Sequence, residues 1–301
     1  MRRSFRIVMI FALMLGSVAL YAAAPKYSAL YVFGDSYCDV GNIYAKAQYP
    51  PPPYLPGRFS NGPIWVDHIA SYLGVPLEPV LKGGTDYAFG GAWATAPATI
   101  EGLDGVVIPS VPQQVQMYLG SHGGKADPNA LYFLEGGGND IVKTTSTDPE
   151  ALGYQIAAAL ADSELMLRRA GARHFLIPNL FNVGLLPVAT EIGRVQFAAA
   201  ASAAANKWLA RLLKFEEMLP RVQIIRVDIN SLMNAIMKDE THFNFQDVKK
   251  FCLTTTSLCS DPNEFFFWDD FHPTAFAHAD FAVAIENALA TENTRANEDE
   301  Q

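Results

Sequence analysis

Basic residues are scarce in this sequence. Its 301 residues include 22 Lys and Arg against 31 Asp and Glu, which gives a formal net charge of -9, and no basic stretch follows the N-terminal segment. Proteins bind the phosphate backbone of nucleic acids through clustered Lys and Arg side chains. We therefore expect no nucleic-acid partner. The same charge argues against electrostatic docking on an anionic bilayer, and only transient contact with a membrane surface remains open.

Cysteine is also rare, with 3 residues in all. Cys252 and Cys259 are close enough in sequence to close a small loop, and a disulfide there would contribute about 2.5 kcal/mol on a chain-entropy estimate. Cys38 would then be unpaired; alternatively, all three cysteines are reduced and partly buried. No grouping of His, Cys, Asp or Glu has the spacing of metal ligands, so we expect no metal and no other cofactor.

The N-terminal segment differs from the rest of the chain. Three arginines precede an apolar run at 7–20, and small residues follow at 22–24. A membrane-spanning helix needs about 20 apolar residues, whereas a shorter run between basic and small residues is typical of a secretory signal peptide. We expect residues 1–24 to be a signal peptide, cleaved between Ala22 and Ala24, and the mature protein to be secreted or periplasmic. The alternative is an uncleaved anchor.

The rest of the chain has the composition and rhythm of a globular α/β protein. Half of the residues are apolar and 18% are charged. Short β-branched and aromatic runs alternate with longer helical stretches, and the short runs are continuously apolar, as in a parallel sheet that is covered on both faces. The expected strands are 29–33, a weak one at 77–81, 131–135, 174–177 and 223–227. The expected helices are 63–73, 111–119, 151–170, 191–218 and 273–289.

Three segments interrupt this rhythm. Residues 49–56 contain a run of prolines and tyrosines, which predicts an extended loop that either walls a substrate entrance or is a stiff surface connector. Residues 238–264 form an irregular excursion that contains the cysteine pair. Residues 291–301 are polar and acidic, and we expect them to be a disordered tail.

Polar residues follow glycines at the ends of two expected strands. The strand at 29–33 is followed by Gly34, Asp35 and Ser36, and the strand at 131–135 is followed by three glycines and then Asn139. In parallel α/β sheets, ligands bind beyond the carboxyl ends of the strands. These two strand ends are therefore the expected position of a functional site.

Ester hydrolysis through a serine needs a nucleophile, a base and donors for the oxyanion. Ser36 is a candidate nucleophile, although a Ser there could equally cap a helix. His272 is a candidate base, and Asp269, three residues earlier, can orient its ring. An isolated Asp-x-x-His is weak evidence, and the spacing alone does not choose between Asp269 and Asp270.

The residues alone leave the identity of the oxyanion donors open. Asn139 carries a neutral amide that could donate to an oxyanion, but an Asn after Gly also caps helices. The pair Gly90-Gly91 offers a bare backbone N–H, which is a weak signal by itself.

Four blocks in order, with a further segment after the first, resemble the GDSL (SGNH) family of esterases and lipases, in its bacterial secreted lipolytic branch. The blocks are VFGDSYCDVGN at 32–42, YAFGGA at 87–92, GGND at 137–140 and FWDDFHPT at 267–274, and the further segment is RFSNGP at 58–63 with Trp65 and Asp67. They span nearly the whole chain that follows the expected signal peptide.

The resemblance implies a flavodoxin-like three-layer α/β/α sandwich with a parallel sheet of about five strands, in a single hydrolase domain at 25–290. It also implies a catalytic triad of Ser36, His272 and Asp269, with oxyanion donors from the backbone of Ser36 and Gly91 and the side chain of Asn139. Aligning the short second block does not firmly separate Gly91 from Gly90.

The chain departs from the family pattern at two positions. Tyr37 stands where the family has Leu, which should change only packing near the nucleophile. Asp86 stands where the family usually has Asn, so a local hydrogen bond should differ.

The resemblance implies a serine ester hydrolase that acts on acyl esters through an acyl-enzyme. The branch suggests lipid substrates, with phospholipase A, lysophospholipase or lipase activity and some acyl transfer. A carbohydrate acetylesterase uses the same groups and is the main alternative; a non-catalytic secreted binding protein is another. Oligomeric state cannot be read from the sequence. Cys38 is a poor nucleophile candidate, because it would point away from the position of Ser36.

Overall fold

A parallel sheet of four strands forms the centre of the protein. The computed structural model describes residues 26–100, 103, 105–214 and 221–299, so the expected signal peptide lies outside the described residues. Neighbouring strands are in the order β1-β4-β5-β6, and all pairs are parallel. The strands are β1 (Leu30–Phe33), β4 (Leu131–Leu134), β5 (His174–Pro178) and β6 (Gln223–Val227).

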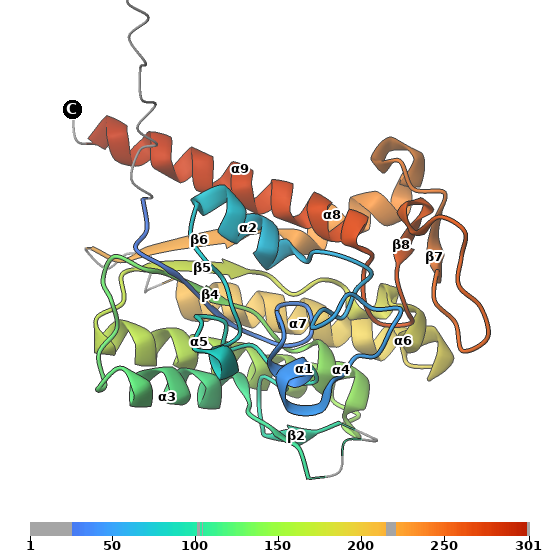
Figure 1. Ribbon diagram of the computed structural model, residues 1–301, viewed down its shortest axis with the longest axis horizontal. Coiled ribbons are helices and arrows are strands. Elements are labelled where there is room, and N and C mark those ends of the chain that lie inside the picture. The colour runs from blue at the N-terminus through green and yellow to red at the C-terminus, as the bar shows by residue number, and fades with distance from the viewer. Residues whose placement is uncertain (1–25, 101–102, 104, 215–220, 300–301) are drawn as a thin grey trace, which may run out of the picture.

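Helices cover both faces of this sheet. Figure 1 shows α2, α8 and α9 on one face and α3, α5 and α7 on the other, which makes the three-layer α/β/α sandwich that the resemblance implied. Every side chain of β4 is buried, as expected for a central strand between two helical layers. The helices are α2 (Trp65–Leu73), α3 (Val111–Ser121), α5 (Pro149–Ala170), α7 (Val195–Leu213), α8 (Ile229–Lys238) and α9 (Ala275–Asp299).

Shorter elements lie at and around the carboxyl edge of the sheet. They are α1 (Asn42–Ala47), β2 (Ala98–Thr99), β3 (Val107–Ile108), α4 (Gly138–Lys143), α6 (Pro187–Glu191), β7 (Asp247–Phe251) and β8 (Phe265–Phe267). Short 3-10 turns occur at Val80–Lys82, Val183–Leu185, Glu240–Phe243 and Pro262–Glu264. These elements and their loops carry most of the side chains of the site.

The expected fifth strand is reduced to single-residue bridges. Asp86 makes one parallel bridge with Val32 of β1 and another with Pro79. Pro76 and Pro79 lie in or beside the expected strand at 77–81, and proline cannot donate to a sheet ladder. The described sheet therefore has four strands rather than about five.

Two expected helices also differ in the structure. The helix expected at 191–218 begins later, at Val195 of α7, because Gly193 takes a φ of +65° and separates α7 from the short α6, which ends at Glu191. Helix α9 continues to Asp299, over most of the segment expected as a disordered tail. No Gly or Pro occurs after Pro273 to end that helix.

The excursion at 238–264 is more regular than expected. Strand β7 pairs in parallel with β8, and a disulfide joins Cys252 to Cys259 just after β7. Cys38 is reduced and buried. Among the described residues, no helix is both long enough and apolar enough to cross a bilayer.

Helices α5 and α7 approach closely through small residues, and Gly153 is the tightest point. A Cβ at Gly153 would lie 2.5 Å from Ala204 Cβ and 2.6 Å from Ala205 N. We predict that Gly153→Ala lowers the free energy of unfolding by about 1–3 kcal/mol, because overpacking outweighs the gain in helix propensity. Denaturant unfolding measures the change.

The matched control is Gly120→Ala in α3, where an added Cβ meets nothing within 4 Å. This variant should be as stable as the wild type or more stable by up to about 1 kcal/mol. Equal stability of the two variants would contradict the tight packing at Gly153.

Candidate active site

The predicted site residues come from distant parts of the chain and line one cavity. Ser36 follows β1, Asn139 lies in the first turn of α4 beyond β4, and His272 follows β8. Together with Gly91 and Asp269 they line a cavity of about 280 Å³. Parallel strands bring their carboxyl ends to one edge of the sheet, which explains why residues of β1 and β4 meet there.

Ser36, His272 and Asp269 form a continuous hydrogen-bonded chain. His272 Nε2 lies 2.8 Å from Ser36 Oγ, and His272 Nδ1 lies 2.7 Å from Asp269 Oδ2. If Nδ1 carries the proton and donates it to Asp269, Nε2 is free to accept from the serine hydroxyl. This is the geometry required of a nucleophile, a base and an orienting carboxylate.

The loop that carries His272 is closed by its own backbone. Trp268 N donates to His272 O at 2.7 Å, while Phe271 N and His272 N donate to Asp269 Oδ1 at 2.8 and 2.6 Å. Asp269 therefore builds the loop as well as facing the ring. Of the two adjacent acidic residues, Asp269 faces His272, which the spacing alone could not decide.

Asp269 has the ionisation state that this role needs. Burial by itself would raise its pKa, but the charge of His272 and hydrogen bonds from His272 and Tyr54 hold the pKa below its usual value. The carboxylate therefore stays ionised at neutral pH and can stabilise an imidazolium.

Three residues with N–H donors lie together on the cavity wall. Within the described residues, the backbone N–H groups of Ser36 and Gly91 have no hydrogen-bond partner, and both residues line the cavity with Asn139. Gly90 N, in contrast, donates to Asp39 Oδ2 at 2.8 Å. This difference favours Gly91 over Gly90 as the oxyanion donor.

Buried carboxylates hold the glycine segment in place. Asp39 also accepts from the backbone of Gly41, Asn42 and Ile43, at 2.7, 2.6 and 3.1 Å. Asp86, where the family usually has Asn, accepts from Val40 N at 2.8 Å and from Ala88 N at 2.9 Å. A carboxylate accepts at both oxygens, whereas an amide accepts at only one.

Asp35 builds the turn that projects Ser36. Its backbone oxygen accepts from Cys38 N and Asp39 N at 3.0 Å, and its Oδ1 accepts from Tyr37 N at 3.0 Å. Its Oδ2 accepts from Asn139 Nδ2 at 3.3 Å, which ties the Asn139 side chain to the turn that carries Ser36. Burial raises the pKa of Asp35 to about 6. Burial also raises the pKa of the neighbouring Glu135.

Tyr37 does more than fill space beside Ser36. Its ring stacks on Phe181 with 4.7 Å between centroids, and its hydroxyl donates to Phe271 O at 2.8 Å. The tyrosine therefore ties the Ser36 turn to the His272 loop. The sequence predicted a change in packing only, and packing alone would not make this link.

Aromatic and aliphatic side chains form most of the cavity wall. Tyr49 and Tyr54 come from the proline-rich loop at 49–56, which therefore does border the site. Several other lining residues could not be predicted from the sequence, because they come from loops and short helices without periodicity. These lining residues are Ile100, Val142, Lys143 and Val188.

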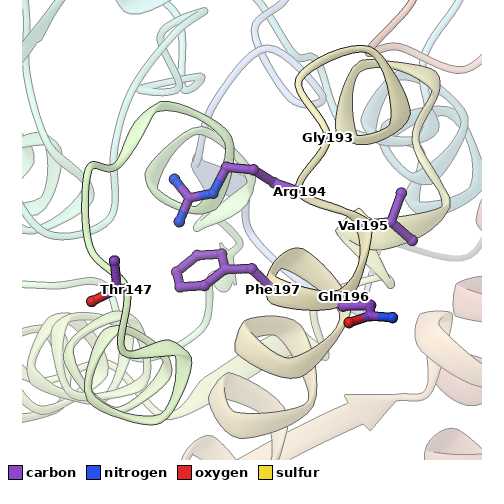
Figure 2. A pocket seen from close by; sticks show the side chains of 6 residues that line it. All are labelled: Thr147, Gly193, Arg194, Val195, Gln196 and Phe197. Carbon is purple, nitrogen blue, oxygen red and sulfur yellow. The ribbon is translucent and has the colours of Figure 1, made fainter.

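A second surface cavity, of about 600 Å³, shares no lining residue with the first, and Figure 2 shows the side chains that line it. Arg194 is its only charged lining residue, and its guanidinium donates to the backbone oxygens of Thr144 and Ser146. The same guanidinium stacks over Phe197, 3.9 Å from the ring centroid. These contacts hold the guanidinium against the fold. Elsewhere in the described part of the chain, no three His, Cys, Asp or Glu side chains group as metal ligands would.

Comparisons with known proteins found similar sequences and folds. A family profile described as GDSL-like Lipase/Acylhydrolase matches residues 30–285. The chain is 29% identical over 253 residues to a phosphatidylcholine-sterol acyltransferase of Aeromonas hydrophila, covering 80% of this chain and 71% of that protein. It is 26% identical over 378 residues to lipase 1 of Photorhabdus luminescens, covering 96% of this chain but only 54% of that protein.

Among solved structures, a carbohydrate acetylesterase from Sinorhizobium meliloti aligns with a TM-score of 0.49 at 16% identity, covering 87% of this chain and 98% of that one.

The buried Asp35 should make stability depend on pH. Its pKa of about 6 in the folded protein exceeds the usual 3.8, so the folded state holds this proton to higher pH than the unfolded chain does. Stability is therefore lost as pH rises through this interval. We predict that the free energy of unfolding of Asp35→Asn, relative to wild type, rises by roughly 3 kcal/mol between about pH 4 and pH 7. Urea unfolding at a series of pH values measures this difference, and a constant difference across the interval would contradict the assignment.

Proposed function

The chain belongs to the GDSL-like lipase/acylhydrolase family and is a carboxylic ester hydrolase of that family, and we propose that it cleaves acyl esters of lipids with Ser36 as nucleophile. The observation that carries the proposal is the chain of contacts from Ser36 through His272 to Asp269, with the Ser36–His272 contact 2.8 Å long. This chain opens into a cavity whose walls are mostly apolar.

The proposed reaction proceeds through an acyl-enzyme. His272 Nε2 takes the proton of Ser36 Oγ as this oxygen bonds to the ester carbonyl carbon. The carbonyl oxygen becomes an oxyanion, which the N–H groups of Ser36, Gly91 and Asn139 stabilise. When the tetrahedral intermediate collapses, the C–O bond to the leaving alcohol breaks and His272 returns the proton to that oxygen.

Water then completes the proposed cycle. His272 removes a proton from water as the water oxygen bonds to the acyl carbon. The second tetrahedral intermediate collapses by breaking the bond between the acyl carbon and Ser36 Oγ, and His272 returns the proton to Oγ, which releases the free acid and regenerates Ser36. An alcohol in place of water would give acyl transfer by the same steps, which is the reaction named for the relative in Aeromonas hydrophila.

Two observations support lipid substrates: the apolar side chains of the cavity and the signal-peptide pattern of the N-terminal segment. Tyr49, Phe59, Ile100 and Val188 offer apolar surface next to Ser36, and each buried CH₂ of an acyl chain contributes about 0.8 kcal/mol. The N-terminal pattern supports export, so we include secretion or a periplasmic location in the proposal. An acetyl ester would leave most of this apolar surface unused.

The first test removes the nucleophile or the base. We expect Ser36→Ala and His272→Ala to unfold as the wild type does but to lose nearly all turnover of a short-chain p-nitrophenyl ester. General base catalysis alone typically contributes about 10²- to 10⁴-fold. Ser71→Ala, at an exposed position of α2, is the control and should keep full activity. Near wild-type rates in either active-site variant would exclude the assignment, and failure of a fluorophosphonate to label Ser36 would favour a non-catalytic binding protein.

The second test asks whether the apolar wall selects the acyl group. We expect the wild type to prefer acyl chains longer than about eight carbons, because each added CH₂ finds apolar surface. Val188→Phe narrows the cavity and should lower kcat/KM for long chains about tenfold more than for short ones. Val283→Phe, at a position of α9 that is 53% exposed, is the matched control. A wild-type preference for acetyl esters would instead support the carbohydrate acetylesterase.

A further inference from the structure

Tyr54, in the proline-rich loop, contacts the orienting carboxylate. Its Oη donates to Asp269 Oδ2 at 2.7 Å. We propose that Tyr54 is a positioning residue for ester hydrolysis, which holds the Asp269 carboxylate in the plane that His272 requires. The inference rests on the proposed function and adds a positioning side chain behind the Ser36–His272–Asp269 chain.

The other donors to Asp269 all come from its own loop. Phe271 N and His272 N donate to Oδ1, and His272 Nδ1 lies 2.7 Å from Oδ2. Among the described residues, Tyr54 is therefore the one hydrogen-bond donor that fixes this carboxylate relative to a separate part of the fold. Without this hydrogen bond, the Asp269 carboxylate and the His272 ring could tilt together, and the hydrogen bonds between these two residues would be kept.

The Tyr54 hydroxyl is equipped to remain a donor. Burial and then the negative charge of Asp269 raise the pKa of Tyr54 well above its usual value. The hydroxyl therefore keeps its proton across the working range of an esterase. The ring packs edge-on against Trp268, with 5.8 Å between centroids, which restricts its rotation.

The segment after Tyr54 is attached to the chain that follows His272. Ser60 Oγ donates to Pro273 O at 2.9 Å, and Asn61 Oδ1 accepts from Ala275 N at 2.8 Å. Leu55 N donates to Ser60 O at 2.9 Å, which links Tyr54 to these anchors. These contacts keep the hydroxyl beside Asp269 Oδ2.

Loss of the hydroxyl should have two effects. The carboxylate would lose a positional restraint, which should lower kcat. It would also leave more negative charge on the carboxylate oxygen that faces His272, so the acidic limb of the pH–rate profile should move up. The phenyl ring would remain in the cavity wall, so KM should change little.

The experiment compares Tyr54→Phe with Tyr49→Phe. Both tyrosines line the cavity, but the Tyr49 hydroxyl has no hydrogen-bond partner within the described residues. For Tyr54→Phe we expect kcat to fall about tenfold, KM to stay within about twofold, and the acidic limb of kcat/KM to rise by about 0.5 pH unit. Tyr49→Phe should leave the acidic limb in place, whatever it does to substrate affinity. Identical acidic limbs in wild type and Tyr54→Phe would overturn the proposal.

Ser60→Ala separates the hydroxyl from general loosening of the segment. Ser60 is fully buried and anchors the segment without touching Asp269, so its loss should lower stability without moving the acidic limb. An equal shift in Ser60→Ala and Tyr54→Phe would show that the effect is structural, and would overturn the role of the hydroxyl.

A measurement without substrate distinguishes this inference from the proposed function. The His272 ring proton that faces Asp269 should give a low-field proton NMR resonance, which Tyr54→Phe should move and Tyr49→Phe should not. If the wild type hydrolyses no ester but this resonance responds as expected, the proposed function fails while the contact stands. If the wild type is active and the resonance does not respond, the positioning role fails alone.

Discussion

The contact between His272 Nε2 and Ser36 Oγ is the constraint on which the site depends, because it joins side chains 236 positions apart. Its length is set by two loops that are each closed by an aspartate: Asp35 folds the turn of Ser36, and Asp269 folds the loop of His272. Neither loop belongs to a regular helix or strand. The sheet supplies their common position and the aspartates supply their shape, so reactivity here is a property of tertiary structure rather than of any one segment.

The α/β alternation and four of the five expected strands could be predicted from apolar runs, since a strand buried on both faces has a strong compositional signal. The weak strand at 77–81 could not be judged in this way, because prolines lie among its apolar residues. A proline prevents strand pairing only where its nitrogen would have to donate, so its effect depends on which neighbouring strand would pair with the segment. The break at Gly193 was missed for a related reason: one residue with φ of +65° ends a helix without changing the periodicity around it. Continuous patterns are therefore more predictable than their interruptions.

The site shows a similar division. Family blocks placed Ser36, His272 and Asn139 because each is embedded in a short motif, and the structure brings these three residues together. The partner of the Gly90 N–H could not be found from the motif, since it depends on where the Asp39 carboxylate lies in space. The contact between Tyr54 and Asp269 spans 215 positions and belongs to no repeating pattern. The proline-rich loop did mark the cavity wall, but composition could not show which hydroxyl would reach the carboxylate.

The acidic side chains that support these loops change how the charge of the molecule should be understood. Asp35, Asp39, Asp86, Glu135 and Asp140 are all buried, and burial raises the pKa of each. The formal net charge of -9 counts all five side chains as ionised. The exterior that solvent and large assemblies meet is thus closer to electroneutrality than composition implies. Repulsion between this exterior and a negatively charged surface should be weaker than the formal charge suggests, because these acidic side chains lie away from the solvent.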